Sequence, residues 1–425
     1  MNHPTRRRSG RLALTASAAI LTLTALSACG SGFAGSSDSS GAAATSQAPN
    51  STPISVLIGS SGQAETTSVK NAVAAWSKQS GVKADVVVAS DLVQQASQGF
   101  ASGKPADVLY VSGDQIGAWA SNGSLEAYGD NLPNKEDFYP KLREAFTYNG
   151  KLYCAPKDFS TLGLVINKDL WSKAGLTDAD IPTTWDQLEA TARKLTTDKV
   201  KGLAMSPEIA RVGVFMAQAG GGLESADRKT ATADSEQNVT ALTYVKKLLN
   251  EGVAAYSSQL GSGWGGEAFG KGQAAMVIEG NWIAGAMKND YPNVKYTVAE
   301  LPVGPAGKGT LQFTNCWGLS TDGKNKGAAQ QLVQYLTSTE QQMAFAKGFG
   351  VMPSVQSAAD QYSSLFPQDK AFLAGAAYAQ NLPLQPGAAA VIKDLNAKLE
   401  GLKTADPKAI LTATQANLQP VVAGK

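Results

Sequence analysis

Acids, amides and large aromatic rings stand at the places where predicted strands end. In AAMVIEGNW an apolar run from Ala274 is followed by Glu279, Gly280, Asn281 and Trp282. A carboxylate and an amide can hydrogen-bond hydroxyl groups, and a tryptophan offers a flat apolar face. Because open α/β sheets bind ligands beyond the carboxyl ends of their strands, we expect these side chains to line a cleft. A core position is the alternative for Trp282, but Gly280 and Asn281 favour a loop.

Two other side chains follow the same logic. Asp114 ends the predicted strand PADVLYVSGD and is a candidate to bind a ligand, with a helix N-cap before Gln115 as the alternative. Trp264 lies in GSGWGGE, where flexible neighbours give it little to pack on. We therefore expect Trp264 to be a loop aromatic that reaches into the cleft.

Composition excludes several kinds of chemistry. The only histidine is His3, which lies in a predicted leader, so the mature chain has no Ser-His-Asp system and no His-based zinc site. No EF-hand spacing or close cysteine pair is present, and neither a metal nor a cofactor is expected. A two-carboxylate glycosidase that uses Asp114 and Glu279 is an alternative, although no residue pattern marks a raised-pKa acid.

The N-terminus predicts an exported, lipid-anchored protein. Residues 1–28 combine four arginines with the uncharged apolar run Leu12–Ala28, as in a secretory signal peptide. The sequence LSAC that ends at Cys29 resembles a bacterial lipobox, in which the cysteine carries the lipid; a plain cleavage site is the alternative. Residues 29–52, rich in Ser, Gly and Ala, predict a flexible tether. We expect anchoring to the outer face of the bacterial cell membrane.

Charge and cysteine content add two further expectations. Removing a leader with four arginines and no acid changes the net charge from +2 to −2, and no basic tract remains, which argues against nucleic acid as a partner. Besides Cys29 the chain holds Cys154 and Cys316. An even pair in an exported protein favours a disulfide, and two buried free thiols are the alternative.

The elements that must position these residues alternate between strand and helix. Predicted strands cover 54–62, 82–90 and 105–114, and an amphipathic helix covers 183–195. Such alternation predicts an α/β fold with a parallel sheet. Since 425 residues are too many for one core of ordinary size, two lobes are expected.

Taken in order, several segments resemble one family, the extracellular solute-binding proteins of ABC importers, in the sugar-binding, maltose-binding-protein-like group. The lipobox and tether come first, followed by PADVLYVSGDQIGAWASNGSLEAY, GKLYCAPKDFSTLGLVINKDLW, TTWDQLEATARKL, EAFGKGQAAMVIEGNW, FTNCWGLS and FGVMPSVQSA. The resemblance implies two lobes, 53–157 plus 316–360 and 158–315 plus 361–425, joined by a hinge of crossing segments around an interlobe ligand cleft. It places Cys154 and Cys316 on two segments close to the hinge.

The resemblance also implies roles for individual residues. Trp282 matches the stacking aromatic of the family, and Asp114 matches an acid that binds sugar hydroxyls. Polar contacts are implied for the crossing segment and the strand ends, and Arg211 roughly matches a ligand-facing stretch. The remaining candidate residues are Lys157, Asp158 and Ser160 on the crossing segment, Glu279 and Asn281 beside Trp282, and Trp317, which either lines the cleft or packs at the hinge.

The expected function is transport-related binding. By resemblance, a monomer captures a mono- or oligosaccharide by lobe closure and delivers it to the ABC permease subunits without acting as an enzyme. Maltose specificity does not carry over, because Val111 and Gln115 replace a tryptophan and a charged residue of maltose-binding protein. The same fold with a non-sugar solute, such as a polyamine, peptide or phosphonate, is the alternative.

Overall fold

A computed structural model describes residues 50–424. The predicted signal peptide, Cys29 and nearly all of the predicted tether lie outside the described residues. Within the described range, none of the helices is long and apolar enough to span a bilayer.

One mixed sheet runs through the described chain. Its strands follow the order β2-β1-β3-β11-β6-β9-β7-β8, with β10 paired to β6 and β12 paired to β11. The strands of this sheet are β1 (Ile54–Ile58), β2 (Ala84–Val88), β3 (Val108–Ser112), β6 (Ala155–Asn167), β7 (Lys201–Met205), β8 (Ala254–Tyr256), β9 (Ala274–Gly280), β10 (Tyr296–Ala299), β11 (Thr310–Leu319) and β12 (Ala379–Gln380). A separate hairpin joins β4 (Thr147–Tyr148) to β5 (Lys151–Leu152).

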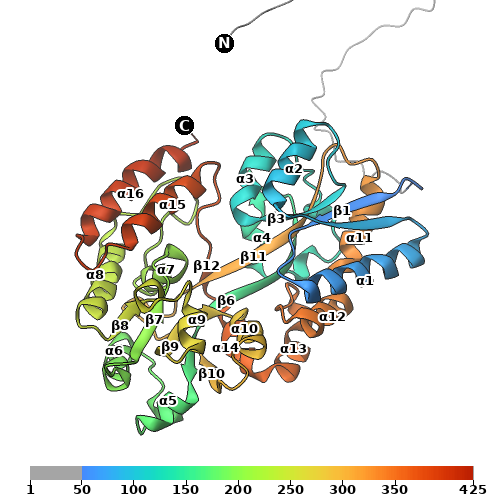
Figure 1. The fold of residues 1–425 in the computed structure, drawn as a ribbon. Helices are drawn as coiled ribbons and strands as arrows, with labels where there is room; N and C mark the ends of the chain where they lie inside the picture. The colour runs from blue at the N-terminus through green and yellow to red at the C-terminus, as the bar shows by residue number, and fades with distance from the viewer. Residues whose placement is uncertain (1–49, 425) are drawn as a thin grey trace, which may run out of the picture. The chain divides into compact units, whose positions relative to one another are not determined.

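Two long strands connect the two ends of this sheet. The first half of β6 pairs with β11, and its second half pairs with β9 and β10. β11 pairs on its other side with β3, so β6 and β11 lie side by side between the β1–β3 end and the β7–β9 end (Figure 1). All thirteen residues of β6 are buried.

The helices surround both ends of the sheet (Figure 1). In the β1–β3 part these are α1 (Gln63–Ser80), α2 (Leu92–Ala101), α3 (Gly113–Ser121), α4 (Pro140–Ala145), α11 (Lys326–Leu336) and α12 (Thr339–Phe349). Elsewhere lie α5 (Lys168–Lys173), α6 (Trp185–Leu195), α7 (Ile209–Gln218), α8 (Glu236–Asn250), α9 (Gly265–Gly270), α10 (Ile283–Asn289), α13 (Ala359–Leu365), α14 (Lys370–Gly375), α15 (Ala388–Leu399) and α16 (Pro407–Val422).

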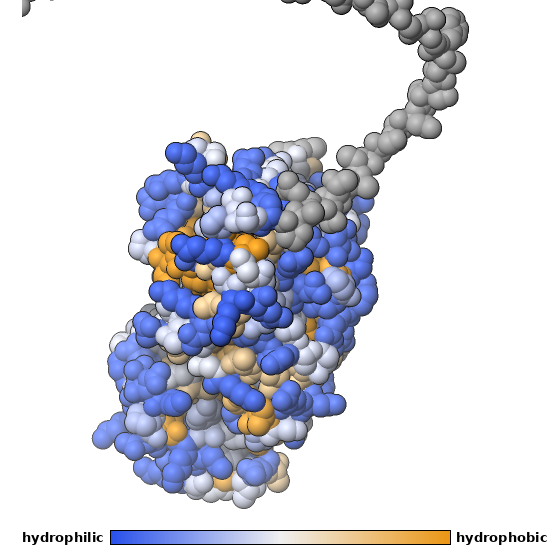
Figure 2. All heavy atoms as spheres, turned by 90° about the vertical axis from the view of Figure 1, so that its right-hand side faces the viewer, coloured by the Kyte–Doolittle hydropathy of each residue, from blue (hydrophilic) through white to orange (hydrophobic). Residues whose placement is uncertain are grey.

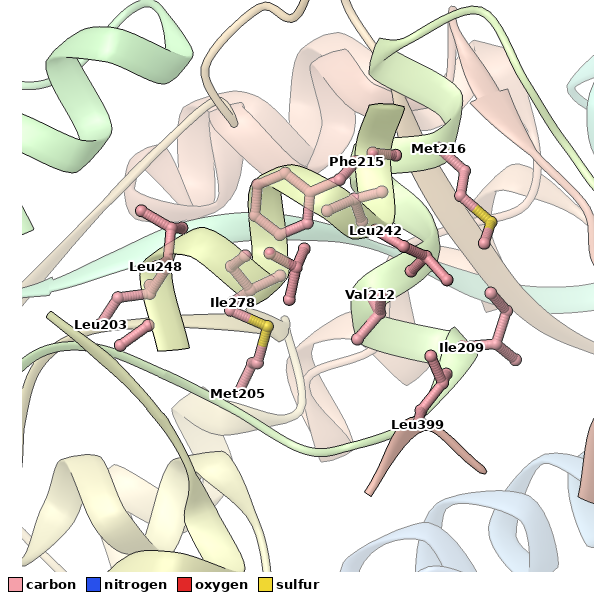
Figure 3. Packing of buried hydrophobic residues seen from close by; sticks show 14 of the residues in the cluster. Leu203, Met205, Ile209, Val212, Phe215, Met216, Leu242, Leu248, Ile278 and Leu399 are labelled. Carbon is pink, nitrogen blue, oxygen red and sulfur yellow. The ribbon is translucent and has the colours of Figure 1, made fainter. Parts of the chain in front are cut away.

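Two large hydrophobic cores stabilise the fold. The first core gathers β1, β3, α1, α11 and α12, with Tyr110, Phe138 and Leu332 fully buried. The second core gathers β7, α6–α8, α15 and α16 around Phe215 and Leu242 (Figure 3). In contrast, the face drawn in Figure 2 is mostly hydrophilic, with hydrophobic side chains in small patches.

Local sequence signals account for several helix starts. The side-chain oxygen of Thr184 accepts a hydrogen bond from the Gln187 backbone N–H at the start of α6, and that of Ser235 accepts one from Asn238 at the start of α8. Such N-caps satisfy amides that have no partner in the first helical turn. The prediction of a capped helix over 183–195 is therefore confirmed, with α6 beginning at Trp185.

The predicted parallel sheet is only partly right. β1 pairs in parallel with β2 and β3, and β7 with β8 and β9. β6 and β11, however, pair antiparallel with each other and with β3, β9 and β10, and only the short β12 pairs in parallel with β11.

The two remaining cysteines lie in the third, smaller hydrophobic cluster. Cys154 precedes β6 and Cys316 lies in β11, and both are fully buried. They form a disulfide with Cα atoms 5.6 Å apart, within the spacing that a disulfide requires. The bond thus links the start of one long strand to the middle of the other.

Candidate functional site

A cavity of about 1480 Å³ lies along β6 and β11. This exceeds the roughly 300–1,000 Å³ of pockets that bury a drug-sized ligand. Its walls come from the start of α1, the end of β3, the turn from β9 into α10, the end of α12 and the segment from β12 into α15. Of the predicted site residues, those that line it are Trp282, Asp114, Asn281, Lys157, Asp158 and Ser160.

Trp282 presents the largest side chain in this wall. It lies two residues after the end of β9, at the start of α10, and is 37% exposed, unlike the buried Trp76, Trp119, Trp171 and Trp185. Its ring lies edge-to-face with that of Phe313, with 5.4 Å between centroids. The indole also folds over Gly280, where an added Cβ would come within 2.4 Å of the ring. Gly280 is therefore needed for this close approach.

Glu279 and Arg211 lie behind Trp282 rather than in the cavity wall. Glu279 is fully buried, and its Oε2 accepts hydrogen bonds from Trp282 Nε1 at 2.9 Å and from Arg211 Nη2 at 2.8 Å. The Arg211 guanidinium carbon lies 5.3 Å from the centroid of the Trp282 ring. Burial raises the pKa of Glu279, although Arg211 opposes that shift. Neither of these two predicted ligand contacts lines the cavity in this structure.

A buried charged cluster forms the opposite part of the wall. Lys157 Nζ binds Glu65 Oε1 at 3.1 Å and also bonds Asp158 Oδ2, and it lies 4.6 Å from the centre of the Tyr110 ring. Glu65 is fixed further by the backbone N–H and hydroxyl of Ser61, at 2.8 and 2.7 Å. Burial opposes the charge on Lys157, but the two carboxylates outweigh it and raise the pKa of Lys157.

An irregularity in β6 brings this lysine to the cavity. Asn315 of β11 pairs with Asp158, whereas Cys316 pairs with Pro156, so that Lys157 is an extra residue in β6. A bulge of this kind redirects the side chains around it. Lys157, Asp158 and Ser160 consequently all line the cavity from one strand.

Asp114 lines the cavity at the end of β3, but it is not an N-cap. α3 begins at Gly113 with Ser112 as N-cap, and the Ser112 hydroxyl bonds Asp114 Oδ1. Gln115 Nε2 donates to the other oxygen at 3.2 Å. The exposed carboxylate is thus oriented in the first turn of α3, where the helix dipole favours an acid.

Asn281 and Ser160 form part of a buried polar junction. The Asn281 backbone N–H donates to Ser160 Oγ at 2.9 Å, and its side-chain amide donates to the Gly350 carbonyl at 2.9 Å. Both side chains are largely buried. This arrangement ties the turn after β9 to β6 and to the end of α12.

Two other candidate tryptophans, Trp264 and Trp317, do not line the cavity. Trp264 packs against the first core and over Gly266, where an added Cβ would approach the indole to 2.0 Å. Glycine therefore gives this ring a surface on which to pack, contrary to the expectation. Trp317 is 1% exposed and packs edge-to-face on Tyr110, so the structure places it in the core rather than in the cavity wall.

Sequence reasoning missed several cavity residues. Phe313 and Asn315 precede Trp317 by four and two positions in β11, and alternation along a strand puts all three on one face. This alternation does not single out Phe313, because Trp317 lies in the core and Gln312 and Thr314, on the other face of β11, also line the cavity. Other unpredicted polar and aromatic residues of the wall include Glu65, Gln312, Phe349, Phe366, Asp369, Asn381 and Lys393.

Among residues 50–424, no group of three or more His, Cys, Asp or Glu side chains is arranged to hold a metal ion.

The sequence matches a known family of bacterial proteins. Residues 71–374 match the family model of bacterial extracellular solute-binding proteins. The chain belongs to this family. The family resemblance predicted from the ordered segments is therefore confirmed.

Two relatives of this solute-binding protein have descriptive names. The maltooligosaccharide ABC transporter solute-binding lipoprotein of Streptococcus pneumoniae is 27% identical over 295 residues, covering 64% of this chain and 66% of that protein. The galactooligosaccharide-binding protein of Bacillus subtilis is 27% identical over 334 residues, covering 74% and 76%. The alignments thus span about two thirds to three quarters of these relatives.

Solved structures agree on the fold. The cyclic α-maltosyl-1,6-maltose binding protein from Arthrobacter globiformis superposes with a TM-score of 0.79 at 21% identity, over 88% of this chain and 99% of that one. The solute-binding protein therefore has the two-lobed α/β fold of these binding proteins, as predicted.

Proposed function

We propose that the protein binds an oligosaccharide in the cavity along β6 and β11 and delivers it to an ABC permease. The observation that carries the proposal is Trp282, a half-exposed indole held in the cavity wall beside hydrogen-bonding groups. An aromatic face next to carboxylates and amides suits a ligand that combines apolar ring faces with hydroxyl groups. The names of the two sugar-binding relatives support this cargo.

The charges in the cavity wall favour a neutral ligand. Carboxylates and lysines are nearly balanced there, and Lys157 is already paired with two of the acids. A polyamine or a phosphonate would need a clear excess of one sign. The acids of the wall are Glu65, Asp114, Asp158, Asp290 and Asp369, and its lysines are Lys157, Lys288, Lys347 and Lys393.

A two-carboxylate glycosidase is the less favoured reading. That mechanism needs both carboxyl groups beside the scissile bond. Glu279 is fully buried and ion-paired with Arg211, so it cannot act together with Asp114 on a substrate in the cavity. We propose that the protein is not an enzyme.

Transport would proceed through movement of the two lobes. We propose the boundaries 53–157 plus 316–360 and 158–315 plus 361–425, with β6 and β11 as crossing segments. Ligand contacts to both lobes would favour the closed state. A monomer anchored through Cys29 to the outer face of the cell membrane would then present its cargo to the permease.

A ligand screen tests the proposal. Purified protein is screened by thermal shift against oligosaccharides, monosaccharides, polyamines, peptides and phosphonates. Ligand at 100 times its Kd should add about 2.7 kcal/mol of stability. We expect the largest rise in Tm with a neutral oligosaccharide; a rise with polyamines, peptides or phosphonates alone would contradict the cargo assignment.

Two variants then test the site. Trp282→Ala should weaken binding of the oligosaccharide found in the screen. As a control, Trp119→Phe, a conservative change at a buried tryptophan outside the cavity, should leave the affinity unchanged. Unchanged affinity in Trp282→Ala, measured by titration calorimetry, would refute the site assignment. Release of shorter sugars from an incubated oligosaccharide would instead support the glycosidase.

A further inference from the structure

We propose that Arg211 and Glu279 are positioning residues, which set affinity by fixing the indole of Trp282 and without touching the ligand. The inference rests on the proposed function, because it concerns how that ring is presented. It begins from one shared atom, since Glu279 Oε2 accepts from both Trp282 Nε1 and Arg211 Nη2.

The contacts restrain the indole on several sides. Glu279 holds the N–H edge of the ring, Arg211 lies against the ring at 5.3 Å, and Phe313 meets it at an interplanar angle of 82°. Arg211 also lies 5.9 Å from the centre of the Phe313 ring, so that one guanidinium contacts both aromatic side chains. With Gly280 beneath the indole, few other orientations remain for Trp282.

Neither charged residue is placed to bind ligand. The Glu279 side chain is fully buried, that of Arg211 is 12% exposed, and neither lines the cavity. The charged residue that approaches Arg211 besides Glu279 is Glu208, at 3.8 Å and half exposed. The Arg211–Glu279 pair therefore acts on the cavity through Trp282.

The chain also makes room for the buried carboxylate. An added Cβ at Gly265 would lie 2.7 Å from Glu279 Oε1 and 2.7 Å from the Val277 side chain. Glu279 Oε1 has no hydrogen-bond partner among the described residues. Burying an ion pair is a poor source of stability, because desolvation offsets the attraction. The buried position of Glu279 is better explained by the two hydrogen bonds that its Oε2 accepts, from Arg211 and from Trp282.

The guanidinium is the part of Arg211 that this role requires. It offers several N–H donors in a fixed plane and a flat face that stacks on aromatic rings, whereas a lysine ammonium is a compact point charge. Arg211→Lys therefore retains the charge opposite Glu279 and removes the stacked plane. Glu279→Gln retains an oxygen for the indole N–H and removes the charge.

Fluorescence tests the positioning in the ligand-free protein. Trp282 is the one tryptophan that lines the cavity and is the most exposed of the seven. We expect Arg211→Lys and Glu279→Gln to increase acrylamide quenching and shift the emission relative to wild type, and Trp282→Phe to abolish that difference. Spectra that match wild type in both variants would overturn the proposal, whatever the cargo is.

A double-mutant cycle tests the effect on binding, using the oligosaccharide from the screen. Arg211→Lys should weaken binding about 2- to 30-fold, the range that a cation–π contact spans. In the Trp282→Phe background the same change should have less than about a two-fold effect. Equal losses in both backgrounds would show that Arg211 acts independently of Trp282 and would overturn the proposal.

Glu208→Gln provides the matched control. It removes the exposed partner of Arg211 and leaves the pair with Glu279 intact. We expect neither the fluorescence nor the affinity to change. If Glu208→Gln reproduces the effects of Arg211→Lys, the general charge around Arg211 determines binding, and the assigned role of Glu279 is wrong.

Discussion

Removing the disulfide should destabilise the protein by several kcal/mol. Cys154 and Cys316 are 162 residues apart, and linking them restricts the unfolded chain. The chain-entropy relation gives about 5 kcal/mol at 25 °C for a loop of this length. The test variant replaces both residues with alanine, because both side chains lie in an apolar cluster and serine would bury two hydroxyl groups there.

Guanidinium chloride unfolding, followed by tryptophan fluorescence, measures the loss. We expect the unfolding midpoint to fall and the m-value to rise, because the unlinked chain exposes more surface when unfolded. Dithiothreitol should shift wild type towards the variant and leave the variant unchanged. Two free thiols in unreduced, denatured wild type, or a loss below about 1 kcal/mol, would refute the reasoning.

Three further outcomes follow from other parts of the structure. Thr184→Ala should lower the free energy of unfolding by about 1 kcal/mol through loss of the α6 N-cap, and an unchanged value in denaturant melts would contradict this. Burial raises the pKa of Asp369, so its contribution to stability is present below the ordinary Asp pKa and is lost as pH rises through the raised value. The Tm of Asp369→Asn minus the Tm of wild type should therefore increase as pH rises through this range. A difference that stays constant with pH would refute the raised pKa of Asp369. Arg228, in the loop after α7, lies 3.4 Å from Glu144 of α4, and Arg228→Ala should cost less than about 1 kcal/mol because the pair is partly exposed. A double-mutant cycle with Glu144→Ala measures the coupling energy between Arg228 and Glu144, and a coupling energy above 2 kcal/mol would contradict the prediction of a weak pair.

Local signals predicted several elements, and long-range pairing limited the rest. A cap and apolar periodicity placed α6, and apolar runs placed β1, β2, β3 and β9. The direction of β6 depends on partners more than 100 residues away in β9 and β11, which no local pattern specifies. The parallel prediction therefore held for β1–β3 and β7–β9 and was wrong for the two crossing strands.

The same distinction applies to the site. The cavity position of Trp282 was predicted because the polar residues that end β9 are visible in the sequence. The two alternatives for Trp317 stayed open, because the sequence does not tell where β11 leaves the cavity and enters the first core. Trp264 looked unpacked, since a glycine neighbour seemed to offer no surface, yet the bare backbone of Gly266 is what its ring covers. Arg211 was expected at the ligand because it roughly matches a ligand-facing stretch of the family, and the sequence holds no sign of the hydrogen bonds that Glu279 accepts from Arg211 and Trp282.

The unbroken course of β6 limits how this cavity can evolve. The strand supplies Lys157, Asp158 and Ser160 to the wall and then continues into the second core through Leu162 and Leu164. Inserting or deleting one residue between these two parts would turn every later side chain to the opposite face. New cargo specificity at this wall must therefore arise by substitution, whereas the turn after β9 and the segment before α15 can also change in length. Directed evolution of the binding range should accordingly vary residue types along β6 and loop lengths elsewhere.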